Sequence, residues 1–140
     1  MTSKAVVALL VALSAWSCAP SGYYSEYCPL PEAGWAYGDT LAFMPDSSVA
    51  PAVDIALRHN DAFPYSSLWI EVSDSLRRDT VRIDLCDSYG RWLGTGFGSS
   101  HQIRVALPFR LSAGRRLSIR HIMRVDTLTG IEQIGLLPAH

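Results

Sequence analysis

Apolar and polar residues alternate in short runs along this chain, and this pattern constrains the fold more than any other feature. Runs with a period of two cover residues 53–58, 68–73, 81–86, 102–107 and 116–123. Successive side chains of a strand point to opposite faces, so each run predicts a β-strand with one buried face. Two further strands are predicted at residues 39–43 and 133–137, and no stretch keeps the period of a helix.

Turn-forming residues separate the runs at the points where hairpins need them. Clusters of Asn, Asp, Ser, Gly and Pro occupy residues 60–64, 87–90 and 112–114. The 140 residues have the length of one domain, and a hydrophobic fraction of 49% is sufficient for one packed core. About seven or eight short strands with regular turns therefore predict an all-β fold, a single antiparallel β-sandwich.

The start of the chain has the composition of an export signal. Lys4 precedes an apolar run at residues 5–13, small residues follow, and Cys18 comes next. The run is shorter than the about 20 apolar residues that span a bilayer, so it predicts the hydrophobic region of a signal peptide. Its end resembles the lipobox of bacterial lipoproteins, in which cleavage precedes a diacylated cysteine, although Ala15 and Trp16 depart from the usual pattern.

These features divide the chain into three predicted parts. Residues 1–17 form the lipoprotein signal peptide, residues 18–34 the lipidated Cys18 with a flexible tether, and residues 35–140 the β-sandwich domain. The alternative is an ordinary secretory signal with an incidental cysteine. Either interpretation predicts an exported protein.

Two further cysteines, Cys28 and Cys86, lie in the predicted mature chain. Exported proteins fold in an oxidising compartment, where two thiols can pair. Cys86 shares a face of its predicted strand with Arg82 and Asp84, and a disulfide would require the N-terminal segment to cross that polar face. We therefore predict that the two thiols are not paired.

No residue pattern indicates an enzyme, a metal site or a cofactor. The glycines of residues 94–98 resemble a phosphate-binding loop, but such a loop precedes a helix, and here a strand is predicted instead. The glycines are therefore expected at bulges, a tight bend or a close backbone approach. There is no nucleophile elbow or acid–base pair, and metal-ligand spacing is absent among the four histidines, which are His59, His101, His121 and His140.

The charge balance also excludes one class of partner. Twelve basic residues face thirteen acidic ones, which gives a formal net charge of -1. Nucleic-acid-binding domains carry a basic stripe or patch, and this chain shows none in its sequence. We therefore expect no nucleic-acid partner.

Three aromatic residues are candidates for contact with a partner. Trp69 is out of phase with its apolar neighbours, so it is expected to point outward. Trp92 and Phe97 bracket three glycines and are expected to present a rigid aromatic contact. Two alternatives stay open: exposed aromatic rings also bind sugars, and Trp92 can instead fill the core.

Several sequence blocks occur in an order that is typical of one family. They are residues 58–60 (RHN), 63–69 (FPYSSLW), 79–81 (DTV), 87–98 (DSYGRWLGTGFG), 119–124 (IRHIMR) and 128–136 (LTGIEQIGL). In this order they resemble the GldH family, the gliding-motility-associated lipoproteins of the Bacteroidota. Its lipoprotein signal agrees with Cys18.

The resemblance implies an accessory lipoprotein that is anchored in the cell envelope by its lipid and faces the periplasm. It implies contacts with other envelope proteins of gliding motility or type IX secretion, and it carries no catalytic residues or cofactor. The alternative function is a glycan-binding envelope lipoprotein that uses exposed aromatic residues against sugar rings.

Overall fold

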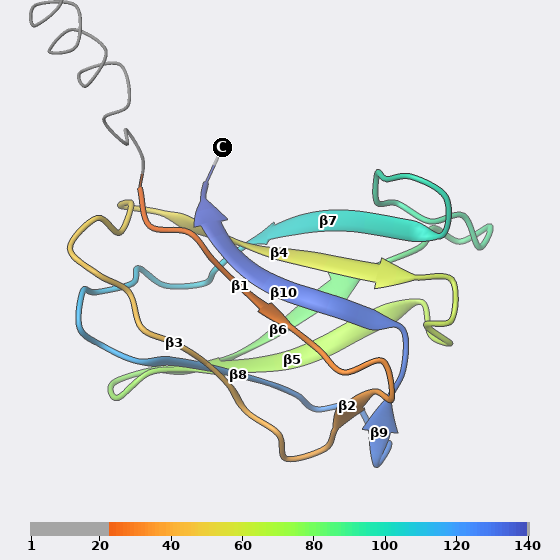
Figure 1. Ribbon diagram of the computed structural model, residues 1–140, viewed down its shortest axis with the longest axis horizontal. Helices are drawn as coiled ribbons and strands as arrows, with labels where there is room; N and C mark the ends of the chain where they lie inside the picture. Colours follow the sequence, from red (N-terminus) through yellow and green to blue (C-terminus); the bar gives the residue numbers. More distant parts are fainter. Residues whose placement is uncertain (1–22, 140) are drawn as a thin grey trace, which may run out of the picture.

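The alternating runs form β-strands in the computed structural model, which describes residues 23–139 (Figure 1). The strands of this part of the chain are β1 (Glu26–Pro29), β2 (Trp35–Ala36), β3 (Leu41–Phe43), β4 (Val53–Asn60), β5 (Ser67–Ser73), β6 (Arg78–Asp84), β7 (Ser100–Ala106), β8 (Leu117–His121), β9 (Thr127–Leu128) and β10 (Ile131–Pro138). Within the described residues, no helix is long and apolar enough to cross a membrane.

Eight of the strands form two four-stranded antiparallel sheets. One sheet has the order β1-β10-β4-β7 and the other the order β3-β8-β5-β6, while β2 and β9 pair in a separate ribbon. The two large sheets lie as two layers in Figure 1. Buried side chains from both, such as Ile55 of β4 and Ile70 of β5, belong to one core. The structure therefore confirms the predicted all-β antiparallel sandwich.

The predicted alternation is clearest in β5. Leu68, Ile70 and Val72 are fully buried, whereas Trp69 between them is 41% exposed, as its phase predicted. β4, which lies between β10 and β7, departs from the pattern, since Asp54 and Ala56 of its outer face are buried as well, whereas Arg58 on the same face is exposed. The buried Asp54 carboxylate forms an ion pair of 3.2 Å with Arg104 of β7.

Residues before position 35, the predicted start of the domain, also belong to the sandwich. Residues 26–29, assigned to the tether, form β1 and pair antiparallel with the edge of β10, with Glu26 opposite Leu136. Tyr24 is also buried against the core. Backbone hydrogen bonds to a distant strand hold β1 in place, so its own sequence needs no alternating pattern.

Cys28 lies in β1, and Cys86 lies two residues beyond the end of β6, a strand of the other sheet. Both are free thiols in the structure. Burial, with a smaller contribution from the charge of Glu26, raises the pKa of the Cys28 thiol. That thiol therefore stays protonated at neutral pH.

The strand directions give the sandwich two ends. The proximal end, on the left of Figure 1, comprises the first described residues, 23–25, together with the loops 44–52, 74–77 and 107–116. Backbone hydrogen bonds of 2.8 Å join Tyr24 to Ser48 and Gly114 to Pro45 there. The distal end, on the right, comprises residues 61–66 and the long connection 85–99.

Candidate functional site

Four rings pack together at the distal end, and we call them the ring cluster (His59, Phe63, Trp92 and His101). His59 and His101 lie opposite each other in the pairing of β4 with β7. The centroid of the His59 ring lies 5.2 Å from His101, 4.8 Å from Trp92 and 6.1 Å from Phe63. Through Trp92, which is half-buried, the cluster holds the connection 85–99 against the sandwich.

His59 is the fully buried centre of the cluster. Its Nδ1 lies 3.1 Å from the backbone oxygen of Asn60, and because a carbonyl oxygen only accepts, Nδ1 carries the proton. Its Nε2 has no hydrogen-bond partner among the described residues. Burial lowers the pKa of His59, and the charge of His101 adds to that effect. The ring is therefore neutral at neutral pH.

Charged and polar side chains surround the rings. His101 Nε2 lies 2.7 Å from Asp61 Oδ1. Glu132 of β10 accepts a hydrogen bond of 2.8 Å from the Ser100 hydroxyl and forms an ion pair of 2.9 Å with Arg58 Nε. The Asp61 and Glu132 carboxylates are therefore bound by neighbouring side chains, and these contacts fix the geometry of the distal end.

Two glycines let the connection pass close to β7. A Cβ atom on Gly96 would collide with the backbone oxygen of Ser100, and one on Gly94 would lie 2.8 Å from that of Gln102. Thr95 between them exchanges two backbone hydrogen bonds with Gln102, of 3.0 and 2.7 Å. The glycines therefore serve a close backbone approach, as expected, and a strand rather than a helix follows them.

Phe97 stands at the tip of the loop that these glycines build. The Ser100 amide donates to the Phe97 carbonyl oxygen at 3.1 Å and closes the turn, and Gly98 has a positive φ of 60°. The Phe97 side chain is 96% exposed. A hollow of about 310 Å³ adjoins it and is also lined by Arg58 and His101.

The three predicted contact residues lie in different settings. Trp92 is half-buried in the ring cluster, Phe97 is exposed at the loop tip, and Trp69 lies on the outer face of β5. The Arg82 guanidinium lies 5.7 Å from the centroid of the Trp69 ring. No aromatic stacking contact joins the three residues in the described part of the chain. Cys18 lies outside the described residues.

Sequence reasoning missed that His59 and His101 form one site. They are far apart in the chain, and only the register of β4 against β7 places them opposite each other. The usable signal was the Arg58-His59-Asn60 block at the end of a predicted strand. Across residues 23–139, the His, Cys, Asp and Glu side chains form no group that could hold a metal ion.

A family profile described as GldH lipoprotein matches residues 22–137, which include the distal end and all of the sandwich except Pro138 of β10. The chain belongs to the GldH lipoprotein family. This confirms the resemblance seen in the sequence blocks, and membership of a lipoprotein family makes the protein a membrane-anchored protein of the cell envelope. A search of curated proteins finds no significant match.

Comparison of this GldH-family protein with solved structures gives two matches. A family GH115 4-O-methyl-α-glucuronidase, BtGH115A, with specificity for decorated arabinogalactans, is similar over 89% of this chain with a TM-score of 0.50 and 13% identity. This chain spans only 18% of that enzyme. Eiger TNF from S. frugiperda gives a TM-score of 0.37 at 13% identity, with 86% of this chain and 94% of that chain covered. At such identities the first likeness concerns the fold alone.

Proposed function

We propose that this GldH-family protein is a non-catalytic accessory lipoprotein of the gliding or type IX secretion apparatus. A lipid on Cys18 holds it in the envelope, and the sandwich faces the periplasm. The distal end contacts other proteins of that apparatus. Family membership supports the anchor and the envelope, and the exposure of Phe97 is the observation that carries the contact.

Phe97 contributes little to folding, because a side chain that is 96% exposed gains almost nothing from burial. The loop beneath it is nevertheless held firmly, by the Thr95–Gln102 hydrogen bonds and by the close approach at Gly96. A rigid loop loses little conformational entropy when it binds, which favours affinity. Large aromatic side chains that become buried at the centre of an interface are typical hot spots.

A photoreactive residue at position 97 tests this proposal in living cells. We expect it to capture envelope proteins that the same residue at position 89 does not capture. Tyr89 is the matched control, since it is 84% exposed in a neighbouring turn of the distal end. Equal capture at both positions would contradict a specific contact at Phe97.

Alanine variants separate contact from packing. Phe97→Ala should weaken binding to the captured partner by about 30-fold or more, equivalent to about 2 kcal/mol, and should leave the free energy of unfolding within about 0.5 kcal/mol. Trp92→Ala should lower that free energy by about 3 kcal/mol, because Trp92 packs in the ring cluster. A Phe97→Ala protein that complements a deletion strain fully would refute the proposed contact.

A second candidate function, glycan binding, is favoured by Trp69. Its ring is 41% exposed on the outer face of a sheet, with the polar Arg82 beside it. Aromatic faces flanked by hydrogen-bonding groups suit sugar rings. A glycan array probed with the wild-type protein and with Trp69→Ala tests this function. Binding that depends on Trp69 would support it, and absence of wild-type binding would exclude it.

A further inference from the structure

The proximal end carries arginines that the fold does not use. Seven arginines pair with a carboxylate within 4.0 Å: Arg58, Arg77, Arg78, Arg82, Arg91, Arg104 and Arg120. The structure gives Arg110, Arg115, Arg116 and Arg124 no such partner among the described residues. The first three lie in the loop 107–116, and we call them the arginine patch (Arg110, Arg115 and Arg116).

The loop that carries the patch is held in place by other groups. The Arg77 guanidinium lies 4.5 Å from the centroid of the Phe109 ring and donates to the backbone oxygen of Arg110 at 2.8 Å. The Gly114 amide donates to the backbone oxygen of Pro45. These contacts use the Phe109 ring and backbone atoms of the loop, so the guanidinium groups of the patch stay available for a ligand.

The patch lies at the end of the sandwich where the chain leads back to Cys18. The amide of Tyr24 bonds to Ser48 in the loop that also contacts the patch loop through Pro45. Only five peptide steps separate Tyr23 from Cys18. An extended chain rises at most about 3.6 Å per residue, so the Cα atom of Tyr23 lies within about 18 Å of the Cα atom of Cys18. A lipid on Cys18 therefore holds the arginine patch near the headgroups.

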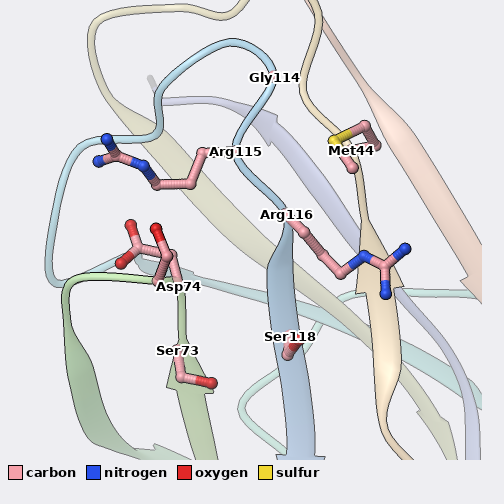
Figure 2. Close-up of a pocket in the computed structure, with 8 residues that line it drawn as sticks. Met44, Ser73, Asp74, Gly114, Arg115, Arg116 and Ser118 are labelled. Carbon is pink, nitrogen blue, oxygen red and sulfur yellow. The ribbon is translucent and has the colours of Figure 1, made fainter.

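The local geometry favours an extended charged surface over a pocket for one anion. A hollow of about 450 Å³ lies beside Arg115 and Arg116, and Asp74 is part of its lining. In Figure 2 the Arg115 and Arg116 side chains extend in opposite directions. The Asp74 carboxylate in its lining pairs with Arg77 at 3.3 Å and offers a phosphate no hydrogen-bond donor. Separate headgroups spread over a membrane surface fit such diverging guanidinium groups better.

Apolar side chains at the same end complete an interfacial surface. Leu76 is 71% exposed in the turn 74–77, Met44 is 51% exposed, and Tyr23 is 61% exposed. Arginines beside exposed aliphatic and aromatic side chains are the composition of surfaces that rest in the headgroup region. Elsewhere in the described chain, the unpaired Arg124 lies beyond β8, toward the distal end.

We propose that the arginine patch docks the proximal end of the sandwich on the anionic phospholipid headgroups of the membrane that holds the lipid anchor. The anchor removes most of the entropic cost of this contact, so three weak charge interactions are sufficient. The proposal rests on the lipid anchor of the proposed function, but not on the distal contact. Docking turns the distal end, with Phe97, away from the membrane.

Hydrogen–deuterium exchange of the mature lipidated protein in nanodiscs tests the docking. The intact mass first establishes the acyl groups. We expect amides of residues 107–116 to exchange at least about fivefold more slowly in discs containing phosphatidylglycerol than in neutral phosphatidylcholine discs, since one arginine near an anionic surface is worth about that factor. Amides of residues 94–98 should show no difference. Salt at about 1 M should abolish the protection because it shortens the screening length.

The decisive variant replaces Arg110, Arg115 and Arg116 with Gln, and it should lose the protection. Its matched control is Arg124→Gln, which removes an unpaired arginine toward the other end and should keep it. Three results would overturn the docking surface. They are equal protection in neutral discs, protection that persists in the triple variant, and protection that appears only with a partner protein. A chain without acyl groups would instead refute the lipid anchor, which distinguishes the two failures.

Discussion

His59 and His121 are both fully buried, and each has one ring nitrogen without a partner among the described residues. His59 Nδ1 donates to the backbone oxygen of Asn60 at 3.1 Å, and His121 Nε2 donates to that of Trp35 at 3.0 Å. In each ring the other nitrogen is therefore unprotonated. Protonating it would place an N–H group and a positive charge in a buried site without a hydrogen-bond acceptor.

These sites make folding sensitive to mild acid. Burial lowers the pKa of both histidines from the ordinary value of 6.5, and the charges of His101 and Arg120 act in the same direction. The unfolded chain therefore binds these protons more readily. The stability that the neutral rings provide is fully present above pH 6.5 and is lost as the pH falls below it. The loss is at most about 1.4 kcal/mol per pH unit for each histidine.

Urea unfolding of the mature chain from about pH 7.5 to about pH 5 measures this loss. For both histidines together we expect up to about 2.7 kcal/mol per pH unit below pH 6.5, out of a typical total of about 5–15 kcal/mol. The carboxylates with perturbed pKa values, such as Glu71 and Asp84, titrate below their ordinary values of 4.5 and 3.8 and therefore outside this window.

Two substitutions keep the hydrogen bond and remove the titration. His59→Asn retains a donor near the position of Nδ1, and His121→Gln retains one near that of Nε2. The double variant should be less stable at neutral pH, but its free energy of unfolding should change less with pH than that of the wild type. Ile119→Val, a buried uncharged change in β8, is the control and should cost about 1 kcal/mol equally at each pH. A double variant with the wild-type slope would refute the reasoning.

Two further predictions concern the loop and the anchor. Gly96→Ala should destabilise the protein more than Gly98→Ala does, because the new Cβ meets the Ser100 backbone at position 96. At position 98 the new Cβ meets open space, and only the positive φ costs about 1–2 kcal/mol. Urea unfolding measures the free energy of unfolding of both variants. Cys18→Ser should abolish fatty-acid incorporation in metabolic labelling and leave an uncleaved or mislocalised precursor, whereas unchanged labelling would contradict lipidation at this residue.

The large strands could be predicted because their signal is local. Each of β4, β5, β6, β7 and β8 contains a run whose apolar side chains alternate within its own sequence, and β10 contains the apolar residues of 133–137 before Pro138. β1, β2 and β9 could not, because they have four or two residues and are defined by their partners. A short edge strand satisfies its backbone through a neighbour, and no feature of its own sequence requires that neighbour.

Some features of the candidate site could likewise be predicted from the local sequence, and others could not. The outward direction of Trp69 and the close approach at the glycines follow from strand phase and from the lack of a Cβ, so the sequence was sufficient for both. The half-burial of Trp92 depends on His59 and His101, which only the register of β4 with β7 brings together. Local patterns cannot specify a contact that depends on pairing between strands distant in the chain.

The distance of Phe97 from the membrane depends on the length of chain before the sandwich and on the length of the sandwich itself. With the proposed lipid anchor on Cys18, at most about 18 Å of chain separates Cys18 from Tyr23, and the sandwich adds the length of an eight-residue strand, β4, or about 25 Å. Since paired strands do not extend or bend as a tether does, the reach of the distal loop is set mainly by the sandwich. A partner that binds Phe97 must therefore expose its own surface close to the membrane that holds the anchor.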